Sequence, residues 1–288
     1  MWLPRAWFTR HFVFTPPTPP SYTRAQCRVL DDGTAVMFVD ARRLAAADTL
    51  GALVVVCSHG NATDAGGGMR ILETLRLVAP SLSVLSYDYP NYGHARRTAD
   101  GTTTVRDCDE ALRAVYRFLT EQERFDAEQV VLLGVSIGAV PTLRLAAELT
   151  RRNVRLGGIV VQSAFTSLRA LVPTLLTWLV DEHDYDNTLA IARVRDDVPL
   201  LIVHGTADAV VPVSHAHTLA HVCTTAVLRV LDGVGHNDFL TTYAPLWTHV
   251  LIHEFIVQRV VAANRAAATR RCLDGACFIA RTHARTHS

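Results

Sequence analysis

Two hydrophobic patterns alternate along the chain. Short continuous apolar runs are typical of strands buried on both faces, whereas apolar residues spaced three or four apart indicate helices that bury one side. The clearest helical pattern covers residues 104–122. Its apolar positions share one face: Val105, Cys108, Leu112, Val115 and Leu119. Strand and helix patterns in alternation predict an α/β fold, with a mostly parallel central sheet and helices on both faces.

The predicted elements form one series without an internal repeat. Predicted strands cover residues 27–30, 35–39, 53–57, 82–87, 129–135, 156–162, 200–204 and 226–231. Predicted helices cover residues 68–77, 104–122, 137–149, 215–222 and 245–262. The first two strands flank Asp31-Asp32-Gly33, which predicts a hairpin with Gly33 in the turn.

We expect a single domain over residues 25–263, preceded by an extended Pro-rich lead-in at 1–24 and followed by a basic, disordered tail at 264–288. The longest interruption, about 165–197, separates two strands and is the place for a short lid. Within it the apolar stretch Leu171–Val180, with Trp178, is too short to span a membrane. We expect it to form a helix that covers a pocket and lines a site for an acyl chain; ordinary packing is the alternative.

Composition narrows the class of protein. Apolar residues make up 49% and charged residues 19%, which is typical of a globular chain. Residues 1–28 and 264–288 each carry a charge of +4; because the whole chain carries +1, the middle carries −7. Because nucleic-acid-binding domains are usually basic, the net negative charge of the middle of the chain predicts no nucleic-acid partner. Six scattered cysteines and no convincing secretory signal predict reduced thiols and a cytoplasmic location.

A candidate nucleophile lies between a predicted strand and a predicted helix. Gly134-Val135-Ser136-Ile137-Gly138 directly follows the apolar run 130–133. A strand, a Gly-x-Ser-x-Gly turn and a helix form the nucleophile elbow of the α/β-hydrolase fold, in which a tight, strained turn exposes the serine hydroxyl at the edge of the sheet. The motif therefore predicts this fold, with Ser136 as nucleophile.

A serine nucleophile requires a base and an orienting carboxylate, which on this fold follow in the order Ser, Asp or Glu, His. Asp208 lies in the loop after the strand at 200–204, and His236 lies in a glycine-containing loop after the strand at 226–231. The sequence thus predicts a Ser136-Asp208-His236 triad. We expect Asp238 to brace the histidine loop and His204 to be structural.

The reaction also requires backbone N–H groups for the oxyanion. One follows the nucleophile, at Ile137. The second comes from the loop after an earlier strand, and we assign it to Asn61, with Ala62 as the next candidate. No cofactor is expected. His215, His217 and His221 have a spacing that metal ligands can have, but without a carboxylate or cysteine partner we expect no metal there.

Several motifs together resemble one family, the alpha/beta hydrolase domain-containing protein 17 family, over about residues 12–260. They are Ser58-His59-Gly60-Asn61-Ala62-Thr63-Asp64, Ser86-Tyr87-Asp88-Tyr89, the segment from Gly134 to Thr142, His204-Gly205-Thr206-Ala207-Asp208 and Gly235-His236-Asn237-Asp238. The chain is more distantly similar to the serine aminopeptidase type of hydrolase domain. The resemblance implies hydrolysis of acyl esters or thioesters, including removal of palmitate from protein cysteines, and carries Ser136, Asp208 and His236 over as the triad.

The chain departs from that family at two places. Members that depalmitoylate proteins at membranes begin with a cysteine cluster that is itself palmitoylated, whereas residues 1–26 here contain no cysteine. Asn91-Tyr92-Gly93 replaces the usual Gly-Tyr-Gly turn, beside the loop expected to bind the oxyanion.

The expected partner is an acyl ester or an acylated protein, bound by a monomer. Peripheral membrane contact is expected through an aromatic and arginine-containing N-terminal segment. Its residues are Trp2, Leu3, Arg5, Trp7, Phe8, Arg10, Phe12 and Phe14. Cys272 and Cys277 in the basic tail are further candidates for acylation.

Two other functions fit the same sequence. A serine peptidase of the aminopeptidase type shares the triad, although no acidic cluster is clearly dedicated to a substrate amino terminus. A catalytically silent binding protein on the same fold would not require all three triad groups.

Overall fold

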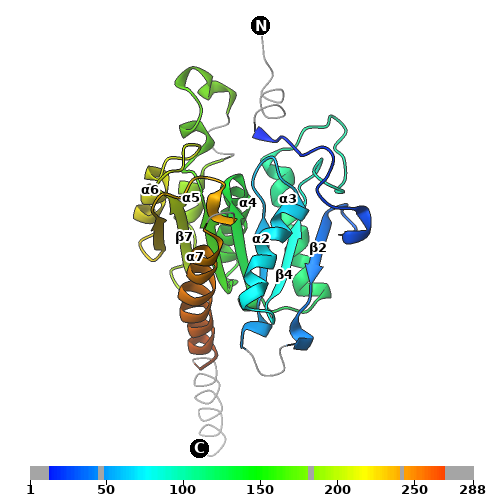
Figure 1. Cartoon of the computed structure of the whole chain (residues 1–288), viewed down its shortest axis with the longest axis vertical. Coiled ribbons are helices and arrows are strands. Elements are labelled where there is room, and N and C mark those ends of the chain that lie inside the picture. Colours follow the sequence, from blue (N-terminus) through cyan, green and yellow to red (C-terminus); the bar gives the residue numbers. More distant parts are fainter. Residues whose placement is uncertain (1–12, 45–48, 181–184, 241–242, 270–288) are drawn as a thin grey trace, which may run out of the picture.

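The computed structural model describes residues 13–44, 49–180, 185–240 and 243–269. Its centre is an eight-stranded sheet with the order β1-β2-β4-β3-β5-β6-β7-β8 (Figure 1). The strands are β1 (Arg28–Val29), β2 (Ala35–Val39), β3 (Val54–Ser58), β4 (Ser83–Tyr87), β5 (Val130–Val135), β6 (Gly158–Gln162), β7 (Leu200–Gly205) and β8 (Val227–Leu231). From β4 to β8 all pairings are parallel, while β2 is antiparallel to both β1 and β4. The predicted α/β-hydrolase architecture is confirmed.

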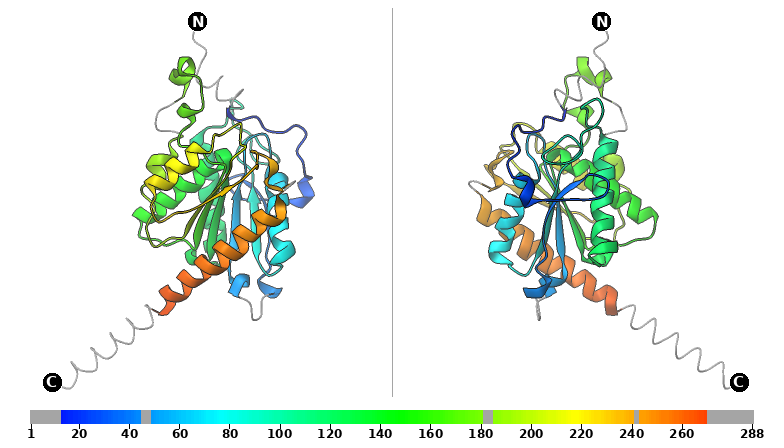
Figure 2. Two further views of the ribbon diagram at one scale, coloured as in Figure 1. Left: turned by 60° about the vertical axis from the view of Figure 1, so that its left-hand side comes forward. Right: turned by 90° about the vertical axis from the view of Figure 1, so that its right-hand side faces the viewer.

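Helices cover both faces of the sheet, as Figure 2 shows. One face carries α2 (Ala65–Val78) and α7 (Ala244–His249). The other carries α3 (Val105–Arg117), α4 (Ala139–Arg151), α5 (Asn187–Ile191) and α6 (Ser214–Val222). Alternate residues of β3 enter separate apolar clusters: Val54 and Val56 face the α3–α4 side, and Val55 faces α2. This two-residue alternation explains why the strands are apolar throughout.

The opening hairpin is confirmed. Arg28 pairs with Val36 and Val29 with Ala35, and Gly33 has the positive φ of 86° that the turn requires. Strand β2 then adds antiparallel to β4, which the sequence pattern alone did not indicate.

The lid region differs from the prediction. Instead of one helix over Leu171–Val180, it holds two short 3₁₀ helices, Leu168–Ala170 and Thr174–Leu179, and α5 follows. Pro173 separates the two with an extended conformation, φ −53° and ψ 142°. Trp178, expected in a pocket, is 51% exposed.

The C-terminal tail also begins later than predicted. After α7 the chain continues in wider π-helical turns over Val250–Val261 and remains helical over residues 262–269. The Asn264 side chain accepts a hydrogen bond from Arg155 at 2.8 Å and donates one to the Glu128 carbonyl oxygen at 2.7 Å. These contacts tie residue 264 to the domain.

The described part of the lead-in packs on the domain instead of preceding it as a separate segment. Phe14 and Tyr22 are 3% and 7% exposed. Phe14, which belongs to the segment expected to contact a membrane, is therefore buried against the domain in this structure. The remainder of that aromatic segment, Cys272 and Cys277 lie outside the described residues. Among the residues that are described, no helix is long and apolar enough to cross a bilayer.

Candidate active site

The three predicted triad residues come together at the carboxyl edge of the sheet. His236 Nδ1 is 2.7 Å from Asp208 Oδ2, and His236 Nε2 is 3.1 Å from Ser136 Oγ. Parallel strands β5, β7 and β8 end at the same edge, so residues 28 and 100 positions from His236 become its neighbours. A hydroxyl, an imidazole and a carboxylate linked in this order can generate a nucleophile.

The local structure at Ser136 follows from its two flanking glycines. Ser136 has a φ of 53°, a left-handed conformation that non-glycine residues rarely adopt. A Cβ on Gly138 would lie 2.0 Å from the Ser58 carbonyl oxygen, and one on Gly134 would lie 2.7 Å from Ala139 Cα. The glycines therefore allow β3 and the start of α4 to approach the turn, which begins as a 3₁₀ turn over Ser136–Gly138.

Asp208 is held as a carboxylate. Its side chain is fully buried, and Oδ1 accepts hydrogen bonds from the backbone amides of Val210 at 2.9 Å and Val211 at 2.7 Å. Burial opposes ionisation, but the hydrogen bonds from His236 and these amides outweigh it and lower the pKa of Asp208. These amide bonds fix the carboxylate so that its other oxygen, Oδ2, faces His236.

Two other residues singled out in the sequence lie next to the triad. Asp238 Oδ2 accepts a hydrogen bond from the Gly235 amide at 2.9 Å, so its expected role in the histidine loop is confirmed. His204 is fully buried, with Nδ1 3.2 Å from the Gly205 carbonyl oxygen and Nε2 3.9 Å from Asp208 Oδ2. Burial lowers the pKa of His204, which keeps a neutral ring beneath the carboxylate.

The predicted oxyanion loop lies next to the nucleophile. A Cβ placed on Gly60 would be 3.7 Å from Ser136 Cβ, which places the His59-Gly60-Asn61 loop against the elbow. The side chain of Asn61 is clamped: Oδ1 accepts hydrogen bonds from Thr15 N at 2.9 Å, Thr15 Oγ1 at 3.2 Å and Tyr92 Oη at 2.9 Å. Sequence reasoning missed Thr15 and Tyr92, although Tyr92 belongs to the turn that departs from the related family.

A buried network extends behind this loop. Asp88 is 0% exposed and accepts hydrogen bonds from Tyr22 Oη and, at 2.7 Å, from the Ala65 amide at the start of α2. Burial raises the pKa of Asp88. His59, also 0% exposed, places Nδ1 2.8 Å from the Gly60 carbonyl oxygen and Nε2 3.9 Å from Asp88. The lead-in and the start of α2 thus hydrogen-bond to one carboxyl group, and His59 of the oxyanion loop lies beside it.

The histidines with metal-like spacing have another neighbour. His215 Nδ1 accepts a hydrogen bond from the Thr166 amide at 3.2 Å and lies 2.9 Å from its hydroxyl. This contact joins α6 to the start of the lid. Within the described parts of the chain, no group of three or more metal-ligating side chains assembles.

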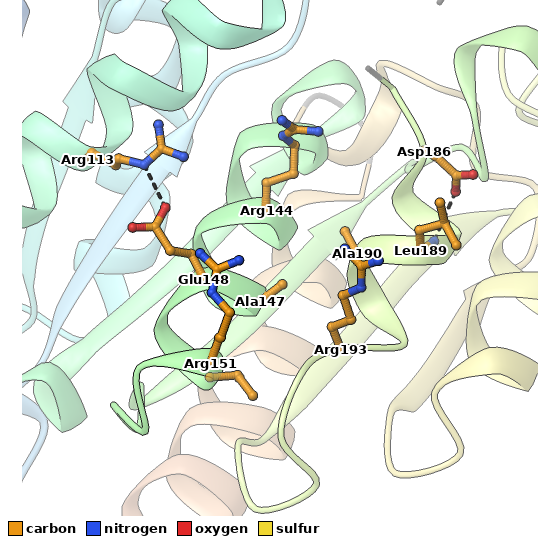
Figure 3. A pocket seen from close by; sticks show the side chains of 10 residues that line it. Arg113, Arg144, Ala147, Glu148, Arg151, Asp186, Leu189, Ala190 and Arg193 are labelled. Atoms are coloured by element: carbon orange, nitrogen blue, oxygen red, sulfur yellow. Dashed lines mark hydrogen bonds and ion pairs between the residues drawn. The ribbon is translucent and has the colours of Figure 1, made fainter. Parts of the chain in front are cut away.

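A separate cavity of about 820 Å³ lies between α3, α4 and α5 (Figure 3). Arginines and acids line it, and Arg113 pairs with Glu148 at 2.6 Å. The lining includes Arg144, Arg151 and Arg193 but no candidate nucleophile and none of the triad. The chemistry therefore favours Ser136, and not this cavity, as the candidate site.

Comparisons with known proteins agree with this architecture. Residues 53–184 match the model of the alpha/beta hydrolase family. The chain is 31% identical over 192 residues to the human alpha/beta hydrolase domain-containing protein 17B, and 32% identical over 184 residues to the Caenorhabditis elegans alpha/beta hydrolase domain-containing protein aho-3. Each match covers 63% of this chain but only 59% and 51% of the respective relative, so the chain matches little more than half of their length.

Solved structures share the fold at lower identity. An esterase from Pyrococcus furiosus superimposes with a TM-score of 0.65 at 16% identity, covering 86% of this chain and 98% of the esterase. A monoacylglycerol lipase from Paleococcus ferrophilus gives 0.56 at 16% identity, covering 73% and 94%. The predicted resemblance in sequence and the predicted fold are both confirmed.

Proposed function

Because the chain is an α/β hydrolase by fold and a relative of the domain-containing protein 17 hydrolases, we propose that it is a serine hydrolase that cleaves acyl esters or thioesters. The observation that carries this proposal is the position of His236, which bridges Ser136 and Asp208 at hydrogen-bond distances of 3.1 and 2.7 Å. A binding protein on this fold would not require such an arrangement.

The proposed reaction starts at the serine hydroxyl. Ser136 Oγ attacks the carbonyl carbon of the substrate while His236 Nε2 accepts its proton. His236 then gives that proton to the departing alkoxide or thiolate, which leaves an acyl group on Ser136. Water, deprotonated by the same ring, releases the acid and restores the serine. Asp208 keeps the proton on Nδ1 and stabilises the imidazolium.

The oxyanion that forms in both steps requires preorganised donors. We assign them to the backbone N–H groups of Ile137 and Asn61, which lie on the two segments that meet at Ser136. The loss of one such donor costs about 3 kcal/mol of transition-state stabilisation in enzymes of this kind.

Depalmitoylation of proteins is the specific activity that the family resemblance favours. Peptidase activity is the alternative. A peptidase that recognises a free amino terminus requires an available carboxylate near the site. Asp64 and Asp88 lie behind the oxyanion loop, but Asp64 accepts hydrogen bonds from Ser21 and Asp88 one from Tyr22. Because the lead-in already uses these groups, we rank ester and thioester hydrolysis first.

Labelling with a fluorophosphonate tests the proposal. We expect the wild-type protein to be labelled and the Ser136→Ala variant to be unlabelled. Ser214→Ala, at an exposed position on α6, serves as the matched control and should label normally. The absence of Ser136-dependent labelling would refute the hydrolase assignment. A palmitoyl-thioester probe, a series of p-nitrophenyl esters and an aminopeptidase substrate then separate the candidate activities.

A further inference from the structure

An apolar recess lies directly behind the candidate oxyanion donor. Its lining comes from the lead-in, the turn after β4, α3, α4 and the lid residue just before α5, and includes Phe14, Tyr89, Val105, Ile137, Val140 and Tyr185. We propose that this recess is the acyl-chain site and that Phe14 occupies it as a removable plug, so that Phe14 sets the acyl length the enzyme accepts. This inference rests on the proposed function.

The position of the recess follows from the chemistry at Ser136. In the acyl-enzyme the carbonyl carbon is bonded to Ser136 Oγ, and its oxygen faces the amides of Ile137 and Asn61. The leaving group departs beside His236, which protonates it. The acyl chain must therefore extend away from His236. The apolar recess lies on the side of the elbow that carries the Ile137 side chain, which is part of its lining. Trp178, which the sequence placed in an acyl pocket, does not line it.

Phe14 fills the space. Its ring is 3% exposed and has edge-on contacts with Tyr89 and Tyr92, with ring centroids 6.5 and 6.4 Å apart. The ring of Tyr185 lies 6.4 Å away on another side. The packed recess leaves no volume that a water molecule could enter. Because the recess is filled, an acyl chain long enough to reach it has to displace the ring.

The plug can leave without unfolding an element, because Phe14 lies outside every helix and strand. Its displacement nevertheless has a consequence for catalysis. The next residue, Thr15, donates two hydrogen bonds to the Asn61 side chain. A chain that pushes Phe14 out therefore loosens the loop that carries an oxyanion donor. We expect long acyl chains to be disfavoured in kcat as well as in binding.

Acyl-length profiles test this inference. The series of p-nitrophenyl esters runs from acetyl through octanoyl to dodecanoyl, and is measured for wild type, Phe14→Ala and the milder Phe14→Leu. We expect the ratio of kcat/KM for octanoyl over acetyl to rise by about tenfold or more in Phe14→Ala, since a hydrophobic pocket discriminates by roughly that factor for each methylene that it excludes. Phe14→Leu should give a smaller rise.

Phe38→Ala is the matched control. It removes the same side-chain atoms from a ring that packs on Phe118 and Phe125, away from the triad. Its length profile should equal that of wild type, whatever its effect on stability. If Phe14→Ala does not fold, the acyl-length profile of Phe14→Leu tests the role of Phe14 instead.

The outcomes separate the two proposals. Variants that retain acetyl-ester hydrolysis with an unchanged octanoyl-to-acetyl ratio would overturn the role of Phe14 and leave the hydrolase proposal intact. A wild-type protein without Ser136-dependent hydrolysis of any ester in the series would overturn the proposed function itself.

Discussion

The backbone N–H of Thr15 donates a hydrogen bond to Asn61 Oδ1 at 2.9 Å, across 46 positions of the chain. Through this contact the lead-in holds the loop that supplies the second candidate oxyanion donor. An amide side chain with three donors on one oxygen has little rotational freedom, so the backbone of Asn61 is held in place beside Ser136.

Tyr92→Phe should lower kcat by about threefold to tenfold and leave KM nearly unchanged. The change removes one hydroxyl that holds Asn61, and an oxyanion donor acts chiefly on the transition state. Steady-state kinetics with p-nitrophenyl acetate measure both constants. Tyr116→Phe, a half-buried tyrosine on α3, is the control and should behave as wild type. An equal loss in both variants would show that Tyr92 acts only through general stability.

Asp208→Asn should reduce kcat by about 10⁴-fold, because an amide favours the wrong tautomer of His236. The folded state should persist, since Asn retains an oxygen that can accept from the Val210 and Val211 amides. Hydrolysis rates measure the first effect and thermal unfolding the second. Asp238→Asn, which keeps an acceptor for the Gly235 amide, should cost far less activity. Comparable losses in the two variants would contradict the assignment of Asp208 as the orienting carboxylate.

Gly138→Ala should destabilise the protein and abolish activity. The added Cβ would lie 2.0 Å from the Ser58 carbonyl oxygen and 2.7 Å from that of His59, so β3 or the elbow must shift. Gly60→Ala is the steric control, because its Cβ would have ordinary contacts at 3.6 Å and beyond. Thermal unfolding should separate the two variants. A Gly138→Ala protein as stable as wild type would show that the turn can relax.

Asp109 makes stability depend on pH. This carboxyl pairs with Arg144 at 2.8 Å, yet burial raises its pKa from 3.8 to about 6. The folded state therefore binds the proton more tightly than the unfolded state. The resulting stabilisation is complete below about pH 3.8 and is lost as the pH rises through about 6.

The pH dependence of the free energy of unfolding tests the raised pKa of Asp109. Between about pH 4.5 and about pH 7.5 the wild type should lose about 2 kcal/mol relative to Asp109→Asn, which cannot titrate at this position. Urea unfolding at the two pH values measures the difference. Glu110→Gln, whose carboxylate is 45% exposed on the same helix, should show no such trend relative to wild type. A difference for Asp109→Asn that stays constant with pH would contradict the raised pKa.

Local signals explain why most of the fold was predictable. The apolar run before Ser136, the flanking glycines and the order Ser136, Asp208, His236 each reflect a short-range requirement of the elbow or of a strand end. The single helix predicted over Leu171–Val180 was wrong because an apolar stretch shows hydrophobicity but not what covers it, and Pro173 divides the stretch. The tail boundary was wrong because the contacts of Asn264 join it to residues 109 and 136 positions away.

By itself, the sequence determined the alternation of elements, the resemblance to a hydrolase family and the types of residue at the candidate triad. All of these depend on neighbours in the chain or on hydrophobic periodicity. Only the tertiary structure decided that Thr15 and Tyr92 clamp Asn61, that Tyr22 reaches Asp88 and that Phe14 fills the recess behind Ile137. Those contacts join segments that lie far apart in the chain, so no local or periodic pattern in the sequence reveals them. The free energy gained by burying and hydrogen-bonding these side chains depends on where the sheet places their partners.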